Sequence, residues 1–446
     1  MKLSYSKLKL ALLKEISIFP LVVFRIAFGL LLCFSLFRFM YNGWIEDCYT
    51  TPLFHFTYQY FNWVTPFETS IMYFIVSVCG LSALFIGLGF LYRISTIVFF
   101  LSFTYLELIE KSWYLNHYYF VSLVAFLLIC VPAHRRFSLD SRIKSDLQLN
   151  TVPNWTIVIL KLQLCCVYFF GGIAKLNSDW LLNAQPLKIW LKARVDLPIL
   201  GSLFEYDITP YLFSWSGMLY DLIIPFLLWT KKTRPIAYVF VVFFHVITYA
   251  LFNIGMFPWL MIFGSLIFIT KQEWQVINNK LFNFQPSKVI QFKNYKTKGF
   301  VIPMIIIFFS FQFLFPFRHH LLTDNVFWTE NGFRFSWHVM VMEKNGYTEF
   351  TVINNDTNER WVEYPSQTLS TIQKKQMSFQ PDMIWQYAQF LKEKYTNKEV
   401  TNCSIYVTSK VALNGRFSQT FINPKTDLVS LKSVDEIYNY IVPLKD

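Results

Sequence analysis

Charged residues and glycine are both scarce in this 446-residue sequence. Asp, Glu, Lys and Arg together make up 15% of it, below the roughly 25% of a typical soluble domain. Glycine occurs only 15 times, which excludes a collagen-like chain. Hydrophobic residues account for 54% and aromatic residues for 20%, a composition that suits contact with lipid, where Trp and Tyr act as interfacial anchors. The composition therefore predicts an integral membrane protein.

Cysteine is too infrequent for a disulfide framework. The chain has seven cysteines, an odd number in a large protein. Cys48 and Cys403 lie outside the apolar runs and could meet, although nothing in their spacing requires it. The other five lie inside apolar runs, where a thiol packs as a small hydrophobic group: Cys33, Cys79, Cys130, Cys165 and Cys166.

Several common catalytic motifs are also missing. The sequence has no G-x-S-x-G elbow, no H-E-x-x-H, no C-x-x-C pair and no Walker loop. The excess of basic residues belongs to the apolar part, because residues 1–317 hold 26 Lys and Arg against 14 Asp and Glu, whereas residues 318–446 hold 14 of each. This distribution argues against a nucleic-acid-binding domain and suits loops that face anionic lipid.

Nine apolar runs predict the membrane-spanning helices. Three of them are shorter than the roughly 20 residues that a spanning helix needs, so we predict an α-helical polytopic bundle of about eight or nine transmembrane helices. The runs cover residues 21–40, 70–91, 94–109, 118–132, 155–176, 211–230, 235–252, 256–270 and 299–317.

Basic residues alternate between the loops in the way that the positive-inside rule requires. With the N-terminus inside, the inner segments carry 18 Lys and Arg and the outer segments carry 4. Nine spans then place residues 318–446 on the outer face, which is the periplasm in a Gram-negative cell. No cleavable signal peptide is expected, because the first apolar run is too long for one. We therefore predict a multi-pass protein of the inner (cytoplasmic) membrane.

From about residue 318 the sequence changes to the period-2 alternation of β-strands. Hairpin turns are predicted at Asn345–Gly346 and Asn414–Gly415, and an amphipathic helix over residues 382–395. Residues 1–317 are thus a predicted membrane domain, and residues 318–446 a small, β-rich α+β domain outside the membrane. The predicted strands cover residues 333–343, 348–353, 360–364, 403–413 and 416–422.

Ionisable residues within the apolar runs are candidates for chemistry, because each costs roughly 2.5–3.5 kcal/mol to insert at a helix centre. Lys175 ends the run CCVYFFGGIAK. A lysine kept away from water loses its proton more easily and can act as a general base near neutral pH. Alternatively, Lys175 reaches the membrane surface beside Asp179, with Trp180 as an anchor. Both interpretations stay open at this point.

The other candidates within the runs are a histidine, an aspartate and an arginine. His245 lies in the middle of a run, either as a neutral histidine hydrogen-bonded to a neighbouring helix, for example to Asp221, or as a group that moves a proton or positions a ligand. Asp221 is interpreted chiefly as the structural partner of a cation such as Arg25.

Two further histidine-containing pairs lie at the ends of apolar runs. Asn116–His117 is interpreted either as a helix cap within an interfacial aromatic belt or as an amide and an imidazole at the same membrane depth as Lys175. His319–His320 opens the predicted outer domain. Adjacent histidines can bind a metal, but more often they are simply solvated at a boundary.

Together these segments resemble the vitamin K-dependent gamma-carboxylase family, whose membrane part is also called the horizontally transferred transmembrane (HTTM) domain. The resemblance extends over nearly the whole chain and rests on the order and spacing of short segments, each weak by itself. These are FRIAFG (24–29), LYRIS (91–95), KSWYLNH (111–117), AKLNSDW (174–180), FHV with FNIGMF (244–257), WTENGFRFSW (328–337) and FINPKTDLV (421–429).

The resemblance implies an enzyme that couples epoxidation of a reduced naphthoquinone to carboxylation of glutamyl side chains. A lysine deprotonates the bound hydroquinone, O2 adds, and the strong base that results removes a γ proton from glutamate. The carbanion takes up CO2, and the quinone leaves as its 2,3-epoxide. Lys175 matches the family's catalytic base, Asn116 and His117 match its quinone-site amide and histidine, and His245 and His320 match further histidines of the family.

The implied cofactor is reduced vitamin K or a menaquinol-type hydroquinone, with O2 and CO2 as co-substrates and no metal. The expected partners are a glutamate-containing protein or peptide and membrane lipid, without nucleic acid. Two alternatives stay open. One is a quinol-epoxidising membrane oxidoreductase without carboxylation, and the other is a non-enzymatic membrane transporter or scaffold.

Overall fold

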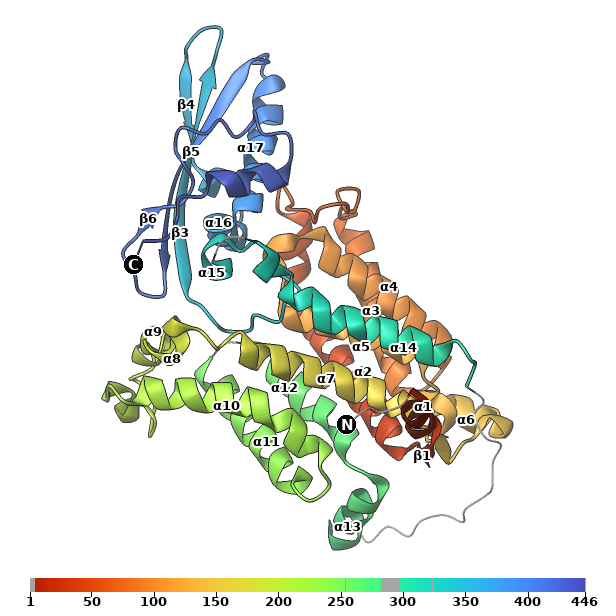
Figure 1. The fold of residues 1–446 in the computed structure, drawn as a ribbon. Coiled ribbons are helices and arrows are strands. Elements are labelled where there is room, and N and C mark those ends of the chain that lie inside the picture. Colours follow the sequence, from red (N-terminus) through yellow and green to blue (C-terminus); the bar gives the residue numbers. More distant parts are fainter. Residues whose placement is uncertain (1–4, 253, 282–296, 323–324, 446) are drawn as a thin grey trace.

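The computed structural model describes residues 5–252, 254–281, 297–322 and 325–445. A helical membrane part is joined to a smaller C-terminal part (residues 325–445) that contains a sheet (Figure 1). Seven described helices are long and apolar enough to cross a membrane. They are α2 (Phe19–Tyr41), α3 (Thr69–Leu88), α4 (Tyr92–Ile109), α7 (Trp155–Ile173), α10 (Thr209–Trp229), α11 (Arg234–Leu251) and the span Val301–Leu321, which begins as α14 (Val301–Leu314).

Two further apolar helices, α5 (Asn116–Cys130) and α12 (Phe257–Gly264), are shorter, and α12 continues as a 3-10 turn over Ser265–Phe268. Each of the predicted apolar runs coincides with one of these helices. The prediction of a polytopic helical bundle with a small α+β part is therefore confirmed.

The remaining elements connect these helices or build the C-terminal part. Strands β1 and β2 pair antiparallel, with Ile16 opposite Val152, and so hold the N-terminal segment against the start of α7. The elements are α1 (Tyr5–Leu13), β1 (Glu15–Ser17), α6 (Leu139–Ile143), β2 (Thr151–Pro153), α8 (Ser178–Leu181), α9 (Leu187–Lys192), α13 (Lys271–Leu281), α15 (Val326–Thr329), β3 (Lys344–Asn354), β4 (Arg360–Glu363), α16 (Thr371–Met377), α17 (Pro381–Thr396), β5 (Cys403–Leu413) and β6 (Gln419–Thr420).

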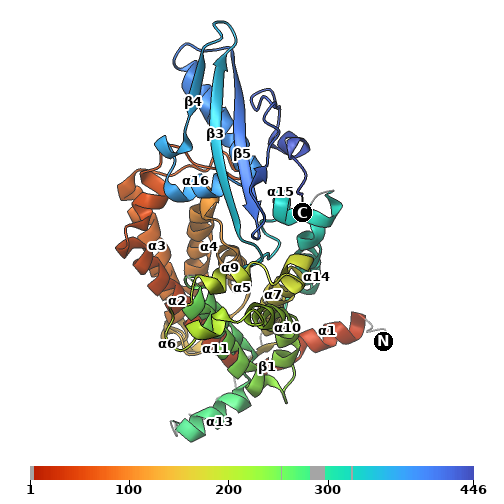
Figure 2. The ribbon, with the colours of Figure 1, turned by 90° about the vertical axis from the view of Figure 1, so that its left-hand side faces the viewer.

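The C-terminal part is built on an antiparallel sheet in the order β4–β3–β5–β6, and Figure 2 shows β4, β3 and β5 side by side. Phe350 pairs with Val407 and Val352 pairs with Ile405 across β3 and β5, and all four side chains are buried. They form one hydrophobic core with α17 residues such as Tyr387. The alternation read from the sequence therefore gives the buried face of the sheet.

The first predicted hairpin turn is wrong. Asn345–Gly346 lies inside β3, where Gly346 pairs with Val411 of β5. A Cβ atom on Gly346 would lie 2.4 Å from the carbonyl oxygen of Ser378. Glycine is therefore needed here because the chain between α16 and α17 approaches the strand closely, and the Asn-Gly pair does not form a turn.

The second predicted turn is confirmed, because Asn414 and Gly415 both have positive φ angles, 52° and 80°, as a tight hairpin turn requires.

The strand predicted over residues 333–343 is wrong. This segment is irregular, and within it the indole of Trp337 is buried in the hydrophobic core of the membrane part. Helix α16 was not predicted. Cys48 and Cys403 do not meet, since both are free and lie in separate cores.

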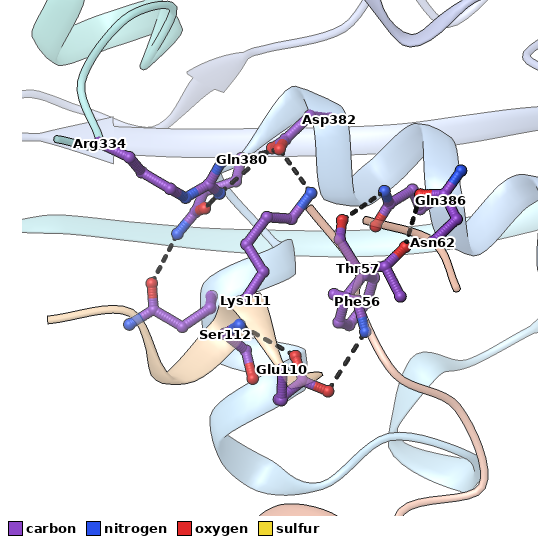
Figure 3. A network of polar contacts seen from close by, with 11 residues as sticks. Phe56, Thr57, Asn62, Glu110, Lys111, Ser112, Arg334, Gln380, Asp382 and Gln386 are labelled. Atoms are coloured by element: carbon purple, nitrogen blue, oxygen red, sulfur yellow. Dashed lines mark hydrogen bonds and ion pairs between the residues drawn. The ribbon is translucent and has the colours of Figure 1, made fainter. Parts of the chain in front are cut away.

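A buried polar network joins the membrane part to the C-terminal part (Figure 3). Lys111, just after α4, and Arg334 both contact Oδ2 of Asp382 on α17, at 2.6 and 2.8 Å. Burial alone would raise the pKa of Asp382, but Arg334 and Lys111 hold it well below its usual value. Next to Lys111, Glu110 accepts hydrogen bonds from the backbone of Phe56 and Ser112. The two parts are therefore held together by charge-assisted contacts as well as by apolar packing.

Helices α2 and α3 pack closely enough to exclude a side chain. A Cβ atom on Gly29 of α2 would lie 2.3 Å from the backbone nitrogen of Gly87 on α3. At Gly80, by contrast, a Cβ atom would meet the Phe37 ring at 3.5 Å, an ordinary contact distance. Small residues allow such close helix packing in membranes, where van der Waals contact drives association.

We expect Gly29→Ala to destabilise the protein by about 1–3 kcal/mol, because the added methyl group must push two backbones apart. Gly80→Ala, the matched control, is expected to leave stability nearly unchanged. Thermal unfolding of both purified variants in detergent measures the difference. Equal melting temperatures would contradict the close contact of α2 and α3.

We expect Asp382→Asn to lower stability by roughly 3–5 kcal/mol, because it leaves two buried cations without their counter-ion. Glu393→Gln, at an exposed position of the same helix, is the control. The pKa of Asp382 is lower in the folded protein than in the unfolded chain, so its stabilisation is complete above about pH 4 and is lost as the pH falls further. Melting curves at pH 7 and pH 3 should therefore show a smaller difference between wild type and variant at pH 3.

Candidate active site

Lys175 follows the last turn of α7, and it is buried, with 6% of its surface exposed. Its Nζ atom donates to Oδ2 of Asp221 at 2.8 Å and to the carbonyl oxygen of Gly171 at 2.9 Å. The ring of Trp180 lies 5.3 Å from the same atom. The amine is therefore removed from bulk water, but it is paired with a carboxylate instead of being isolated among apolar groups.

The alternative in which Lys175 reaches the surface beside Asp179 is not observed. Both carboxylate oxygens of Asp179 contact the guanidinium of Arg416, at 2.8 and 2.9 Å, and Oδ2 also accepts from Asn414 at 2.8 Å. Asp179 therefore anchors the hairpin after β5 to the membrane part, and Lys175 turns the other way.

The predicted pairing of Asp221 with Arg25 is wrong. Arg25 donates to the carbonyl oxygens of Ala133 and Phe137, at 3.2 and 2.6 Å, and so it ties α2 to the segment after α5. Its Nε atom is buried without a hydrogen-bond partner in the described part of the chain. Asp221 is left to pair with Lys175.

Close packing of α7 against α10 brings Asp221 to Lys175. A Cβ atom on Gly172 would lie 2.7 Å from the side chain of Leu222 and 3.0 Å from its backbone nitrogen. A Cβ atom on Gly171 would meet Oδ2 of Asp221 at 3.6 Å. The Gly171–Gly172 pair therefore lets α10 come close enough for its carboxylate to reach the end of α7.

His245 on α11 lies on the same cavity as the ion pair. Its Nε2 atom is 3.0 Å from the hydroxyl of Tyr168 on α7, and not next to Asp221 as the sequence suggested. Its Nδ1 atom is buried and has no hydrogen-bond partner in the described part of the chain. The histidine therefore keeps one ring nitrogen for a further interaction.

A cavity of about 740 Å³ lies beside Lys175, between α7, α10 and α11, and we call it the Lys175 cavity. Lys175, Asp221, His245, Tyr168 and Thr248 are the polar side chains on its wall. The rest of the wall is mostly apolar and aromatic, and it includes Trp180, Trp190, Phe213, Phe244, Phe252, Phe257, Val339 and Met340. This combination of apolar walls and a few convergent polar groups is typical of a small-molecule site.

Asn116 and His117 line an adjoining cavity, which we call the His117 cavity. Asn116 donates to the carbonyl oxygen of His338 at 3.0 Å and accepts from the Tyr114 hydroxyl at 3.0 Å. The His117 ring lies 5.8 Å from the ring of Phe257. The two cavities share the wall residues Ile254, Phe257, Val339 and Met340. The structure therefore brings Asn116 and His117 next to the Lys175 cavity but not into it.

His320 lies elsewhere. It faces a different cavity, together with His319 and His338, and its ring is 4.1 Å from that of His319. Ala174 and Leu176 line this cavity, whereas Lys175 lies on the other side of the chain. No group of three or more His, Cys, Asp or Glu side chains that could hold a metal ion occurs among the residues that the structure describes.

Tyr168 and the segment Val339–Met340 were not selected from the sequence as part of the site, although they line the Lys175 cavity. Tyr168 precedes Gly171 by three residues and Lys175 by seven. Tyr168 and Gly171 therefore lie on one face of α7, Lys175 continues the same spacing just past its end, and this spacing was the available signal. Val339 and Met340 carry no such signal. They reach the site because the chain between Trp337 and β3 folds back over the membrane part.

We expect Asp221→Asn to destabilise the protein by roughly 3–5 kcal/mol, because it leaves the Lys175 ammonium buried without its counter-ion. The double variant Lys175→Met/Asp221→Leu should recover much of this loss, because replacing a buried pair by apolar groups is often nearly neutral. Thermal unfolding of the wild type, Lys175→Met, Asp221→Leu and the double variant forms a complete cycle. Additive losses in the double variant would contradict a direct pair.

Two family models match the chain. The model described as the HTTM domain matches residues 13–274, which is more than half of the chain. The model described as the vitamin K-dependent gamma-carboxylase, lumenal domain, matches residues 297–446. No solved structure matches the chain. The two matches follow one another in sequence and together cover both the helices around Lys175 and the C-terminal sheet. The chain therefore belongs to the vitamin K-dependent gamma-carboxylase family.

Proposed function

We propose that this protein is an integral membrane enzyme that couples epoxidation of a reduced naphthoquinone to carboxylation of glutamyl side chains. The observation that carries the proposal is the Lys175–Asp221 pair, buried at the wall of an otherwise mostly apolar cavity. An ionisable pair inside a membrane is costly and usually functional. The two family matches support the same reaction class.

The wall of the Lys175 cavity fits a hydroquinone in its chemistry. Its aromatic side chains suit a flat, lipid-soluble ring system, and its few polar groups could contact the quinol oxygens. The Nδ1 atom of His245 has no partner in the described part of the chain, so after a change in side-chain rotamer it can form a hydrogen bond with a quinol oxygen. We assign Lys175 and His245 to this site directly, and Asn116 and His117 to the adjoining cavity.

When a hydroquinone is bound and O2 reacts with it, the cofactor supplies the strong base that takes the γ proton of glutamate before CO2 adds. The residues of this chain prepare that step. Transfer of a proton from the Lys175 ammonium to Asp221 leaves a free amine, which can then accept the proton of a quinol hydroxyl. In an apolar cavity the neutral amine–acid form lies closer in energy to the ion pair than it does in water. Asp221 is therefore the positioning partner of the base.

Exclusion of water is the second task of the site, because water would quench a base strong enough to deprotonate carbon. The aromatic wall of the Lys175 cavity serves this purpose from the membrane side. Val339 and Met340 cover it from the side of the C-terminal part. The glutamyl side chain would approach from that same side.

We place the protein in the inner membrane with the N-terminus inside and the C-terminal part outside. The distribution of basic residues among the loops supports this orientation, and so does the description of residues 297–446 as a lumenal domain. The proposed reactants are menaquinol or reduced vitamin K, O2, CO2 and a glutamate-containing protein or peptide. Membrane lipid is the expected surrounding.

The test is a quinol-epoxidation assay on the purified full chain in detergent. We expect Lys175→Ala to lower epoxide formation by about 10²- to 10⁴-fold, because it removes the proton acceptor. Lys161→Ala is the matched control, since Lys161 is a second lysine of α7 whose amine packs against Trp229 and Phe268, away from the cavity. Unchanged epoxide formation in Lys175→Ala would remove this lysine from the reaction.

Labelled bicarbonate and a glutamyl peptide in the same assay separate the alternatives. Incorporation of label together with epoxide formation supports the carboxylase. Epoxide without incorporation indicates a quinol oxidoreductase. Absence of both activities in a folded, quinol-containing sample indicates a transporter or scaffold, and Lys175→Met and His117→Gln should then be tolerated in its function.

A further inference from the structure

The His117 cavity adjoins a further cavity, which we call the Glu107 cavity. It is lined by Glu107 and Glu110 at the end of α4. Trp113, His117, Tyr118 and Met256 line both this cavity and the His117 cavity. A row of spaces therefore runs from the Lys175–Asp221 pair, past His117, to the two glutamates.

Glu107 is a buried carboxyl group whose hydrogen bonding is incomplete. Its Oε2 atom accepts from the hydroxyl of Ser122 at 2.6 Å. Its Oε1 atom is buried without a hydrogen-bond partner among the described residues. Burying a carboxyl group that lacks a partner costs free energy, and such groups within a membrane usually have a function. No ion pair of Glu107 occurs in the described chain.

Glu110 lies where the row of cavities meets the C-terminal part. It accepts from the backbone of Phe56 and Ser112, at 3.2 and 2.9 Å, and from Nε2 of Gln373 on α16 at 2.7 Å. Burial raises the pKa of Glu110 to about 7, so this group can both take up and release a proton near neutral pH.

The proposed reaction leaves one proton to remove in each cycle. The hydroquinone contributes two hydrogens and the glutamyl carbon one, and the water formed from O2 keeps two of these three. The new carboxyl group is ionised at neutral pH, so the third leaves as a proton. Lys175 and Asp221 must then return to their starting state before the next cycle, although both side chains are buried.

We propose that Glu107 is a proton-relay residue, which receives the proton from the Lys175–Asp221 pair by way of His117 and passes it to Glu110 beneath the C-terminal part. The inference rests on the proposed function. The proton moves onto the unpartnered Oε1 atom while Ser122 holds Oε2, and it leaves again from the same carboxyl group. Waters in the His117 and Glu107 cavities bridge the steps, since both spaces have room for water and are lined by polar groups that can bind it.

A channel for the isoprenoid tail of the quinol would also explain a row of cavities. It would not explain why two carboxyl groups line the far end, because an apolar tail is best surrounded by apolar groups. The two explanations predict different kinetics. Loss of a relay residue slows turnover, whereas a change in a tail channel alters the KM for the quinol.

The experiment measures epoxide formation from menaquinol by the full-length protein, in ordinary water and in D2O. For Glu107→Gln we expect kcat to fall at least about tenfold with an unchanged KM for menaquinol and a larger solvent isotope effect. Glu107→Asp, which keeps a carboxyl group, should recover part of the rate. Ser122→Ala, which removes only the hydroxyl donor, should also enlarge the isotope effect.

Glu46→Gln is the matched control. Glu46 accepts from the hydroxyl of Tyr73 at 2.7 Å through one oxygen and has a second, buried oxygen without a partner in the described chain, but it lines none of the three cavities. The Glu46→Gln variant should leave kcat and the isotope effect unchanged. An unchanged kcat and isotope effect in Glu107→Gln, or a raised KM with unchanged kcat, would overturn the relay.

Failure of the relay and failure of the proposed function give different results. An active wild type, an inactive Lys175→Ala and a fully active Glu107→Gln reject the relay alone. Full activity of Lys175→Ala, or an inactive wild type, rejects the proposed function and the relay with it. If Glu107→Gln does not fold, the isotope effects of Glu107→Asp and Ser122→Ala decide, and wild-type values in both would reject the relay.

Discussion

The ion pair between Lys175 and Asp221 determines much of how the membrane part is built. Two opposite charges among apolar side chains attract one another strongly but must first be removed from water, and the balance is favourable only when the atoms are in direct contact. Contact at 2.8 Å requires α7 and α10 to approach closely, and Gly171 and Gly172 permit this. These two glycines also leave a space beside the ion pair, because they have no side chain to fill it.

The C-terminal part completes the site. Val339 and Met340 close the Lys175 cavity, and the backbone of His338 receives the amide of Asn116. These contacts come from one irregular segment, which packs against the membrane part through the buried Trp337 and is tied to α17 by the contact of Arg334 with Asp382. The chemistry that we propose therefore depends on both parts of the chain, and separating them would open the cavity to water.

Hydropathy predicted the helices well because it is a local property. A run of apolar residues must become a helix in lipid, whatever its neighbours are, since every backbone polar group has to be bonded within the segment. Strands were harder to predict. Asn345–Gly346 has the composition of a turn, yet it continues β3 because the chain at Ser378 needs the space that glycine leaves. That space depends on a contact between Gly346 and Ser378, which lie more than thirty positions apart in the sequence.

The candidate residues show the same division. Burial cost alone selected Lys175, Asp221, His245 and Arg25 from the sequence. The first three line one cavity, whereas Arg25 does not. Sequence spacing did not reveal their partners, and it linked Asp221 to Arg25 when the actual partner is Lys175.

The sequence by itself determined the membrane class, the apolar helices, the alternating buried face of the C-terminal sheet and the short set of costly ionisable groups. The tertiary structure decided which of those groups meet: Asp221 with Lys175, Tyr168 with His245, and His320 in a separate cavity. The physical reason is that insertion cost and periodicity are summed along the chain, whereas a hydrogen bond or an ion pair depends on which helix faces come together, to within a fraction of an ångström.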